Sequence, residues 1–139
     1  MSNQENKLKH LEFIQAVISR MANNSFFLKG WTVTIVAALF ALENFNSNGQ
    51  FLLIANYPIF IFWLLNGYFL SQERLFRALY DEVRSLSPDK IDFSMNTKSH
   101  YRGRNTWGRS VFSLTLIIFY PGIIGLVLWM IQLMEAFHG

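Results

Sequence analysis

Cysteine is absent from this 139-residue chain, and charged residues make up only 15% of it. The lack of cysteine excludes disulfides, thiolate metal sites and cysteine nucleophiles. Apolar residues account for 52% of the chain and aromatic residues for 17%, including 14 phenylalanines. Such a composition is typical of helices that face lipid, and it leaves no room for a large soluble domain. The sequence therefore predicts a single small membrane domain spanning residues 1–139.

Three long apolar runs carry little or no charge, at residues 26–45, 51–70 and 111–134. A helix rises about 1.5 Å per residue, so about 20 residues cross the hydrocarbon core of a bilayer. The first run contains Lys29, so it spans only if that ammonium reaches the headgroups; a re-entrant or interfacial segment is the alternative. We expect an all-α integral membrane protein with three transmembrane helices.

The 12 basic residues occupy only two parts of the chain, the region before the first run and the region between the second and third. The positive-inside rule then places the N-terminus and the 71–110 loop in the cytoplasm. The 44–50 turn and the C-terminus are expected outside. The first 25 residues lack the apolar core and cleavage site of a signal peptide, so we expect no cleaved leader.

Two polar regions next to the runs have helical patterns. Residues 8–25 form an expected amphipathic helix, because apolar side chains recur at spacings of three and four from Leu8 to Met21. This helix lies in the interface, packs under the bundle, or lines a vestibule in an oligomer. A bend is possible at Asn23–Ser25. Beyond residue 70 the pattern stays helical, which predicts a cytoplasmic extension of the second span that ends at Ser87, before a proline.

No set of residues with catalytic or metal-binding spacing is evident. The three histidines are isolated from one another, and no glycine-rich loop follows a strand. Asp81 and Glu82 stand at helical distances from Arg77 and Arg84, which favours salt bridges on a solvated face. We therefore expect no enzymatic activity, no metal and no cofactor.

Polar side chains within the runs are candidate pore-lining residues: Thr34, Glu43, Asn56 and Asn66. An unpaired amide in hydrocarbon costs about 2–7 kcal/mol, so these groups must face protein or water. One interpretation is hydrogen bonding between helices. The other is a pore, which three helices cannot enclose alone and which therefore requires a symmetric homo-oligomer. Glu43, near the outer end of the first run, would then form a carboxylate ring that favours cations.

The 71–110 loop carries a second candidate site. Its ordinary role is to set topology and contact anionic lipids of the bilayer. The functional alternative is a site for a nucleotide or short single-stranded nucleic acid, in which guanidiniums grip phosphates and an aromatic ring stacks a base. The candidate ligand-binding residues are Arg74, Arg77, Lys98, Arg102, Arg104 and Trp107.

Residues 11–31, 72–81 and 92–95 resemble a widespread family of small bacterial membrane proteins, within which the chain is similar to the membrane effectors of Hailong antiphage systems. The resemblance implies a tetrameric, ion-channel-like effector of the bacterial inner membrane. It also implies closure by short DNA oligomers that a partner nucleotidyltransferase makes, and opening when phage activity removes them. The alternative is a non-conducting membrane adaptor or assembly subunit that recruits a cytoplasmic partner through residues 72–109.

Overall fold

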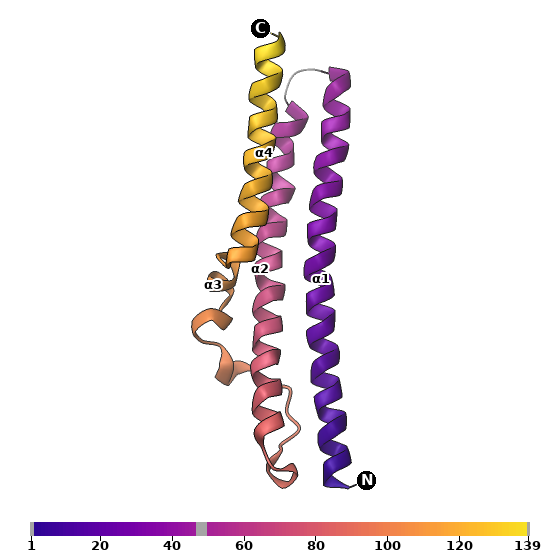
Figure 1. Ribbon diagram of the computed structural model, residues 1–139, viewed down its shortest axis with the longest axis vertical. Helices are drawn as coiled ribbons and strands as arrows, with labels where there is room; N and C mark the ends of the chain where they lie inside the picture. The colour runs from indigo at the N-terminus through magenta and orange to yellow at the C-terminus, as the bar shows by residue number, and fades with distance from the viewer. Residues whose placement is uncertain (1, 47–49, 139) are drawn as a thin grey trace.

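The computed structural model describes residues 2–46 and 50–138, and within these the chain is helical without strands (Figure 1). The helices are α1 (Asn3–Asn46), α2 (Gln50–Ser85), α3 (Trp107–Val111) and α4 (Leu114–His138), with short 3-10 turns at η1 (Pro88–Lys90), η2 (Lys98–His100) and η3 (Gly103–Asn105). Of these, α1, α2 and α4 are long and apolar enough to cross a membrane. The prediction of an all-α fold with three candidate spans is confirmed, whereas the side on which each terminus lies stays a prediction.

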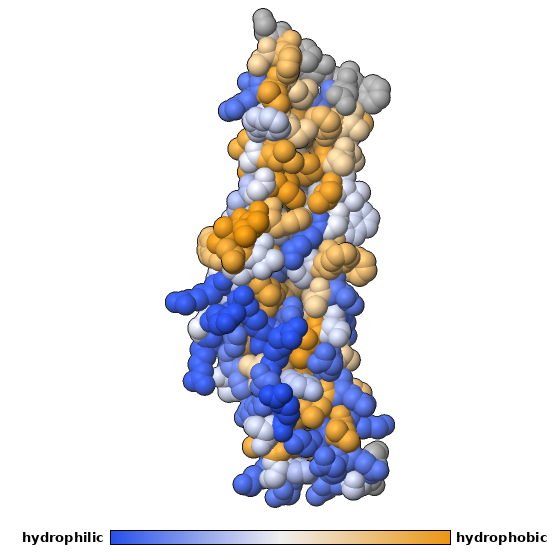
Figure 2. Space-filling view, viewed as in Figure 1, coloured by the Kyte–Doolittle hydropathy of each residue, from blue (hydrophilic) through white to orange (hydrophobic). Residues whose placement is uncertain are grey.

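The three long helices lie side by side, with α2 between α1 and α4 (Figure 1). At about 1.5 Å per residue, the 44-residue α1 is about 66 Å long, roughly twice the thickness of a hydrocarbon core. The surface follows this division, because hydrophobic residues cover the half that contains α4 and hydrophilic residues gather on the other (Figure 2). We call the hydrophilic half of the hairpin, residues 3–25 of α1 and 71–85 of α2, the stalk.

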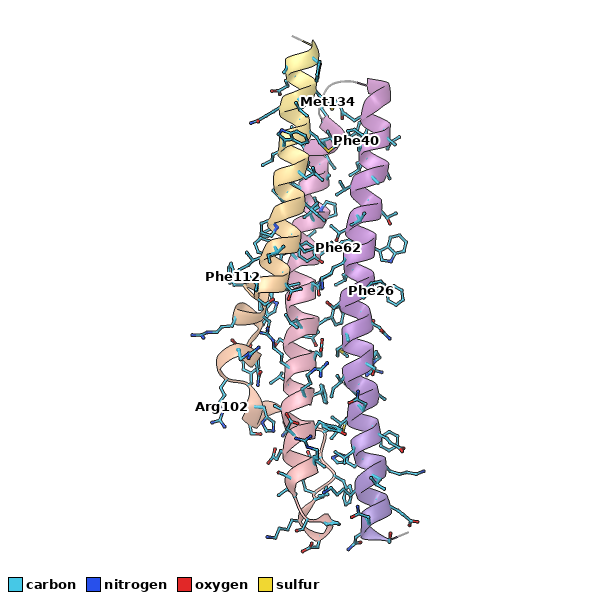
Figure 3. The ribbon with its side chains drawn as sticks, in the orientation of Figure 1. Phe26, Phe40, Phe62, Arg102, Phe112 and Met134 are labelled. Carbon is cyan, nitrogen blue, oxygen red and sulfur yellow. The ribbon has the colours of Figure 1, made fainter. Side chains whose placement is uncertain are left out.

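Two separate cores hold the helices together. In the apolar half, Leu52, Ile59, Leu116, Tyr120 and Val127 are buried between α2 and α4, and α1 contributes partly buried side chains such as Phe40. Figure 3 shows Phe40, Phe62 and Met134 along the inner faces of these helices, whereas Phe26 points away from them. In the stalk, a second buried cluster joins the two helices and the segment after them: Ile14, Ile18, Leu79, Val83 and Ile91.

The predicted bend at Asn23–Ser25 is absent, because α1 runs unbroken from Asn3 to Asn46. The Ser25 side chain, which often competes for backbone groups, is instead engaged by Asn66 of α2. Residues 8–25 are consequently part of the same helix as the first apolar run. Ile14 and Ile18 pack on α2, and the amphipathic character predicted for this segment stays a prediction.

Two predicted boundaries were wrong. The 44–50 turn begins later than expected, since α1 remains helical through Asn46 and residues 47–49 lie outside the described chain. The third apolar helix begins at Leu114 and not at residue 111. The carbonyl of Val111 accepts a hydrogen bond from Trp63 Nε1 at 2.9 Å. This carbonyl therefore has a partner outside its own helix, at the point where the helix breaks at Phe112.

The predicted extension of the second run is helical, since α2 continues through Ser85. Ser87 then adopts an extended conformation before Pro88, as the residue preceding proline does. Residues 87–106, which we call the cationic loop, return along α2 to α3 and so bring the chain back to the base of α4 (Figure 1).

Candidate functional site

The cationic loop is fastened to α2 just before α3 begins. Ser71 Oγ donates a hydrogen bond to the carbonyl of Asn105 at 2.5 Å. Arg74 Nη1 donates to the carbonyl of Arg104 at 2.7 Å and to Ser110 Oγ at 3.3 Å. Two of these contacts use backbone carbonyls of the loop, so they fix its path and leave the charged ends of Lys98, Arg102 and Arg104 exposed.

A second attachment joins the middle of the loop to the stalk. His100 Nε2 lies 2.7 Å from Glu82 Oε2, and the Asn105 side chain donates to the His100 carbonyl at 3.1 Å. Glu82 therefore pairs with His100 of the loop. The salt bridge expected between an arginine and an acidic residue on this face forms between Arg84 Nη2 and Asp81 Oδ1, which lie 3.4 Å apart. The loop is held at both its middle and its end.

The structure separates the six predicted ligand-binding residues into two groups. Arg74 is half-buried and serves as the loop's anchor, and Arg77 is paired along α2 with Glu73 at 2.8 Å. The other four are exposed to solvent, three in the cationic loop and one at the start of α3: Lys98, Arg102, Arg104 and Trp107. Figure 3 shows Arg102 on the flank of the molecule that faces away from α1. A ligand approaching from solvent would meet this exposed group first.

Electrostatics around Arg74 favour an anion. Burial lowers the pKa of the Arg74 guanidinium, and the charge of Arg104 lowers it further, whereas Glu73 raises it. An arginine remains protonated at neutral pH despite such shifts. The two guanidiniums therefore repel each other across the loop anchor, and a bound phosphate or carboxylate would relieve that repulsion.

Tryptophan side chains join the loop, α3 and the apolar half of the bundle. Trp107 Nε1 donates to the Leu64 carbonyl at 3.0 Å, which docks the start of α3 on α2. Trp63 bonds the other end of α3 at Val111 and stacks on Tyr120 of α4, with ring centroids 6.4 Å apart. The residue Trp107 is 46% exposed.

Contact between α2 and α3 depends on a glycine. A Cβ added at Gly67 would lie 2.3 Å from Val111 Cγ2, far closer than two carbons approach. Only glycine permits α3 to sit this near α2 at that position. The sequence did not predict α3, because five residues are too few to show a helical period.

Asn66 is the centre of a buried polar network that links all three long helices. It accepts a hydrogen bond from Ser25 Oγ of α1, and its Nδ2 lies 3.3 Å from the Ser25 carbonyl and 2.8 Å from the Tyr120 hydroxyl of α4. Asn66 and Tyr120 are fully buried. Sequence reasoning named Asn66 but missed Ser25 and Tyr120, although a tyrosine hydroxyl within an apolar run also needs a partner.

The other three predicted pore-lining residues have different surroundings within one chain. Glu43 is fully buried and accepts the backbone N–H of Phe51 at 3.1 Å, at the first turn of α2. Thr34 is exposed and bonds the Gly30 carbonyl of its own helix at 2.9 Å. Asn56 borders a hollow of about 390 Å³ between α2 and α4. A pore lined by these residues stays a prediction that concerns the oligomer.

Comparisons with known proteins found no family model, no curated protein and no solved structure that matches this chain.

Proposed function

We propose that this chain is the membrane effector of a Hailong-type antiphage system that acts by abortive infection. It assembles as a homotetramer in the bacterial inner membrane and forms an ion-channel-like pore. A nucleotide or short DNA oligomer, made by a nucleotidyltransferase encoded nearby, binds the cationic loop and keeps the pore closed. Removal of that ligand during infection opens the pore and depolarises the membrane. The N-terminus and cationic loop lie in the cytoplasm, and the C-terminus lies outside.

The observation that carries this proposal is the short path from the cationic loop to the apolar helices. The anchor of the loop, Arg74, bonds Ser110 within α3. The last residue of α3, Val111, packs against Gly67 and bonds Trp63, which stacks on Tyr120 of α4. A ligand that holds the loop in one position therefore also holds α3 and the base of α4, which is what a ligand-dependent gate requires.

The chemistry of the loop suits a phosphate-rich ligand. Lys98, Arg102 and Arg104 are exposed within a short stretch, and guanidiniums form strong bidentate bonds with phosphates. Tyr101 and Trp107 are 52% and 46% exposed, and either ring can stack on a base. A bound phosphate would also reduce the repulsion between Arg74 and Arg104.

In an oligomer, neighbouring chains or water can contact polar groups on the outer faces of the apolar half. These faces carry the exposed Thr34 and the partly exposed Asn56. In a symmetric assembly such polar groups face neighbouring chains or a water-filled path at low cost, whereas in lipid they are expensive.

The double substitution Arg102→Glu with Arg104→Glu tests the ligand site. We expect it to abolish binding of a short single-stranded DNA oligomer and to make the protein toxic without infection, because the closed state loses its ligand. Each lost phosphate contact also reduces the log–log dependence of binding on salt by about 0.7 units for a single strand.

The matched control is Arg20→Glu with Arg84→Glu, which makes the same change in charge at exposed positions outside the cationic loop. It should retain binding and cause no toxicity. Equal oligomer binding by the wild type and the Arg102, Arg104 variant would remove the loop from the mechanism. Reduced abundance without toxicity would instead favour a role in anionic-lipid contact.

A second candidate function is a non-conducting adaptor. The observation in its favour is the stalk, which extends the α1–α2 hairpin well beyond the apolar half and presents a large hydrophilic surface together with the cationic loop (Figure 2). An adaptor would capture a cytoplasmic protein through residues 72–109 and would pass no current. Conductance measurements distinguish the two functions.

A further inference from the structure

The stalk contains a groove on the side of α1 next to the cationic loop. Its volume is about 770 Å³, within the range of sites that hold small molecules. Side chains of one face of α1 and of residues 93–95 of the loop form its walls, among them Lys9, His10, Phe13, Arg20, Phe93 and Met95. Among the described residues that line it, none is acidic.

The walls of this stalk groove combine exposed apolar surface with two cations. Phe13 is 64% exposed and Phe93 is 45% exposed, in the hydrophilic half of the molecule, where such exposure calls for an explanation. Lys9 and Arg20 lie on the same face of α1, about 16 Å apart at 1.5 Å per residue. An occupant would therefore meet an apolar surface with a positive charge at each end.

The floor of the groove contains an unsatisfied polar atom. His10 is only 5% exposed, and its Nε2 atom is buried without a hydrogen-bond partner among the described residues. Buried polar atoms are normally bonded, so an imidazole nitrogen in this state marks the groove as an unusual place in the stalk. The groove is thus more than an apolar depression.

The wall of the groove that the cationic loop forms contains a strained backbone conformation, at Phe93. Phe93 has a φ of 55°, a left-handed value that is rare for a bulky side chain. Its ring meets the edge of His10 with centroids 5.5 Å apart, and the Asp92 carboxylate accepts the N–H of Ser94 at 3.0 Å, which fixes the turn. Strain of this kind concentrates at binding sites, where it positions a side chain for a ligand.

We propose that the stalk groove binds a soluble amphiphilic anion, a small molecule with an aromatic or aliphatic body and one carboxylate or phosphate group. The body lies on Phe13 and Phe93, and the anionic group pairs with Lys9 or Arg20. This site goes beyond the proposed function, because its cations belong to α1 and not to the cationic loop.

Two other occupants fit the groove less well. A nucleic-acid strand carries a charge every few ångströms, and two cations about 16 Å apart leave most of those charges unpaired. A bilayer lipid would have to leave the membrane, since even Arg20 precedes the first apolar run, at residues 26–45, by about 9 Å of helix. The position in the stalk therefore favours a soluble ligand.

Photolabelling of the full-length protein in nanodiscs tests the proposal. The probe is a trifluoromethyl-diazirinyl benzoate, an aromatic monoanion, and its neutral counterpart is the corresponding benzyl alcohol. Mass spectrometry maps the adducts after irradiation. We expect the benzoate to label residues 9–20 and 93–95. In the Lys9→Gln with Arg20→Gln variant, benzoate labelling should fall about fivefold, as expected for the loss of the one partly exposed ion pair that a monoanion makes, and labelling by the alcohol should stay within about twofold.

Further variants separate the groove from a general effect of charge or folding. Arg77→Gln with Arg84→Gln removes two exposed cations of α2 elsewhere in the stalk and should leave labelling unchanged. Phe13→Ser alters an exposed side chain and should reduce labelling by both probes. The proposal is overturned if no adducts form at the groove, if both probes respond equally to the loss of Lys9 and Arg20, or if a diazirine phospholipid labels the groove as strongly as the benzoate.

Discussion

Replacing Asn66 should reveal how strongly the buried polar network joins the three long helices. Asn66 shares hydrogen bonds with the Ser25 side chain, the Ser25 carbonyl and the Tyr120 hydroxyl. A hydrogen bond between membrane helices contributes about 0.6–1.7 kcal/mol. Three such bonds give an expected loss of about 2–5 kcal/mol in the free energy of unfolding for Asn66→Leu. Tyr120→Phe removes only the hydroxyl and should cost about 0.6–1.7 kcal/mol.

A double-mutant cycle isolates the bond between these two side chains. The unfolding free energy of the wild type, both single variants and the double variant is measured by denaturation with sodium dodecyl sulfate in mixed micelles, followed by circular dichroism. We expect a coupling energy of about 0.6–1.7 kcal/mol between positions 66 and 120. Thr34→Val is the control, since that hydroxyl bonds only its own helix, and should change stability by less than about 0.5 kcal/mol. A coupling indistinguishable from zero would refute the network as described.

Two further predictions concern packing and topology. Gly67→Ala should cost about 1–3 kcal/mol of unfolding free energy by overpacking, because the new Cβ would lie 2.3 Å from Val111 Cγ2. Val111→Ala in the same chain should restore part of the loss, because the Val111 backbone still lies 3.0 Å from that Cβ; an additive double variant would mean that the helices do not meet there. Reporter fusions at residues 90 and 139 should report the cytoplasm and the outside respectively, as the positive-inside rule requires, and the same side for both would eliminate the third span.

Periodicity and charge were sufficient for the long helices because their signal extends over many residues. The three runs gave three long helices, and the polar pattern after residue 70 gave the continuation of α2 through Ser85. The features that were missed are set by tertiary contacts. The break at Phe112 accompanies the hydrogen bond from Trp63 to the Val111 carbonyl. The α1 helix continues through Ser25, whose side chain bonds Asn66 of α2. Neither contact leaves a local pattern.

The candidate site was predictable in composition but not in arrangement. Basic and aromatic residues in the loop indicated an anion site, yet the sequence could not distinguish the anchor Arg74 from the exposed Arg102 and Arg104, because the difference lies in which carbonyls Arg74 reaches across the fold. The stalk groove depends on a strained Phe93 packed on His10, more than eighty residues apart in the chain. Only folding brings that pair together.

Planar-bilayer recording of the purified protein tests the central claim most directly. The account predicts cation-selective current in the absence of ligand, closure on addition of a short single-stranded DNA oligomer to the side that faces the cationic loop, and weaker cation preference in Glu43→Gln at unchanged abundance. Absence of current from protein that is shown to be inserted and oligomeric would contradict the channel proposal and favour the adaptor.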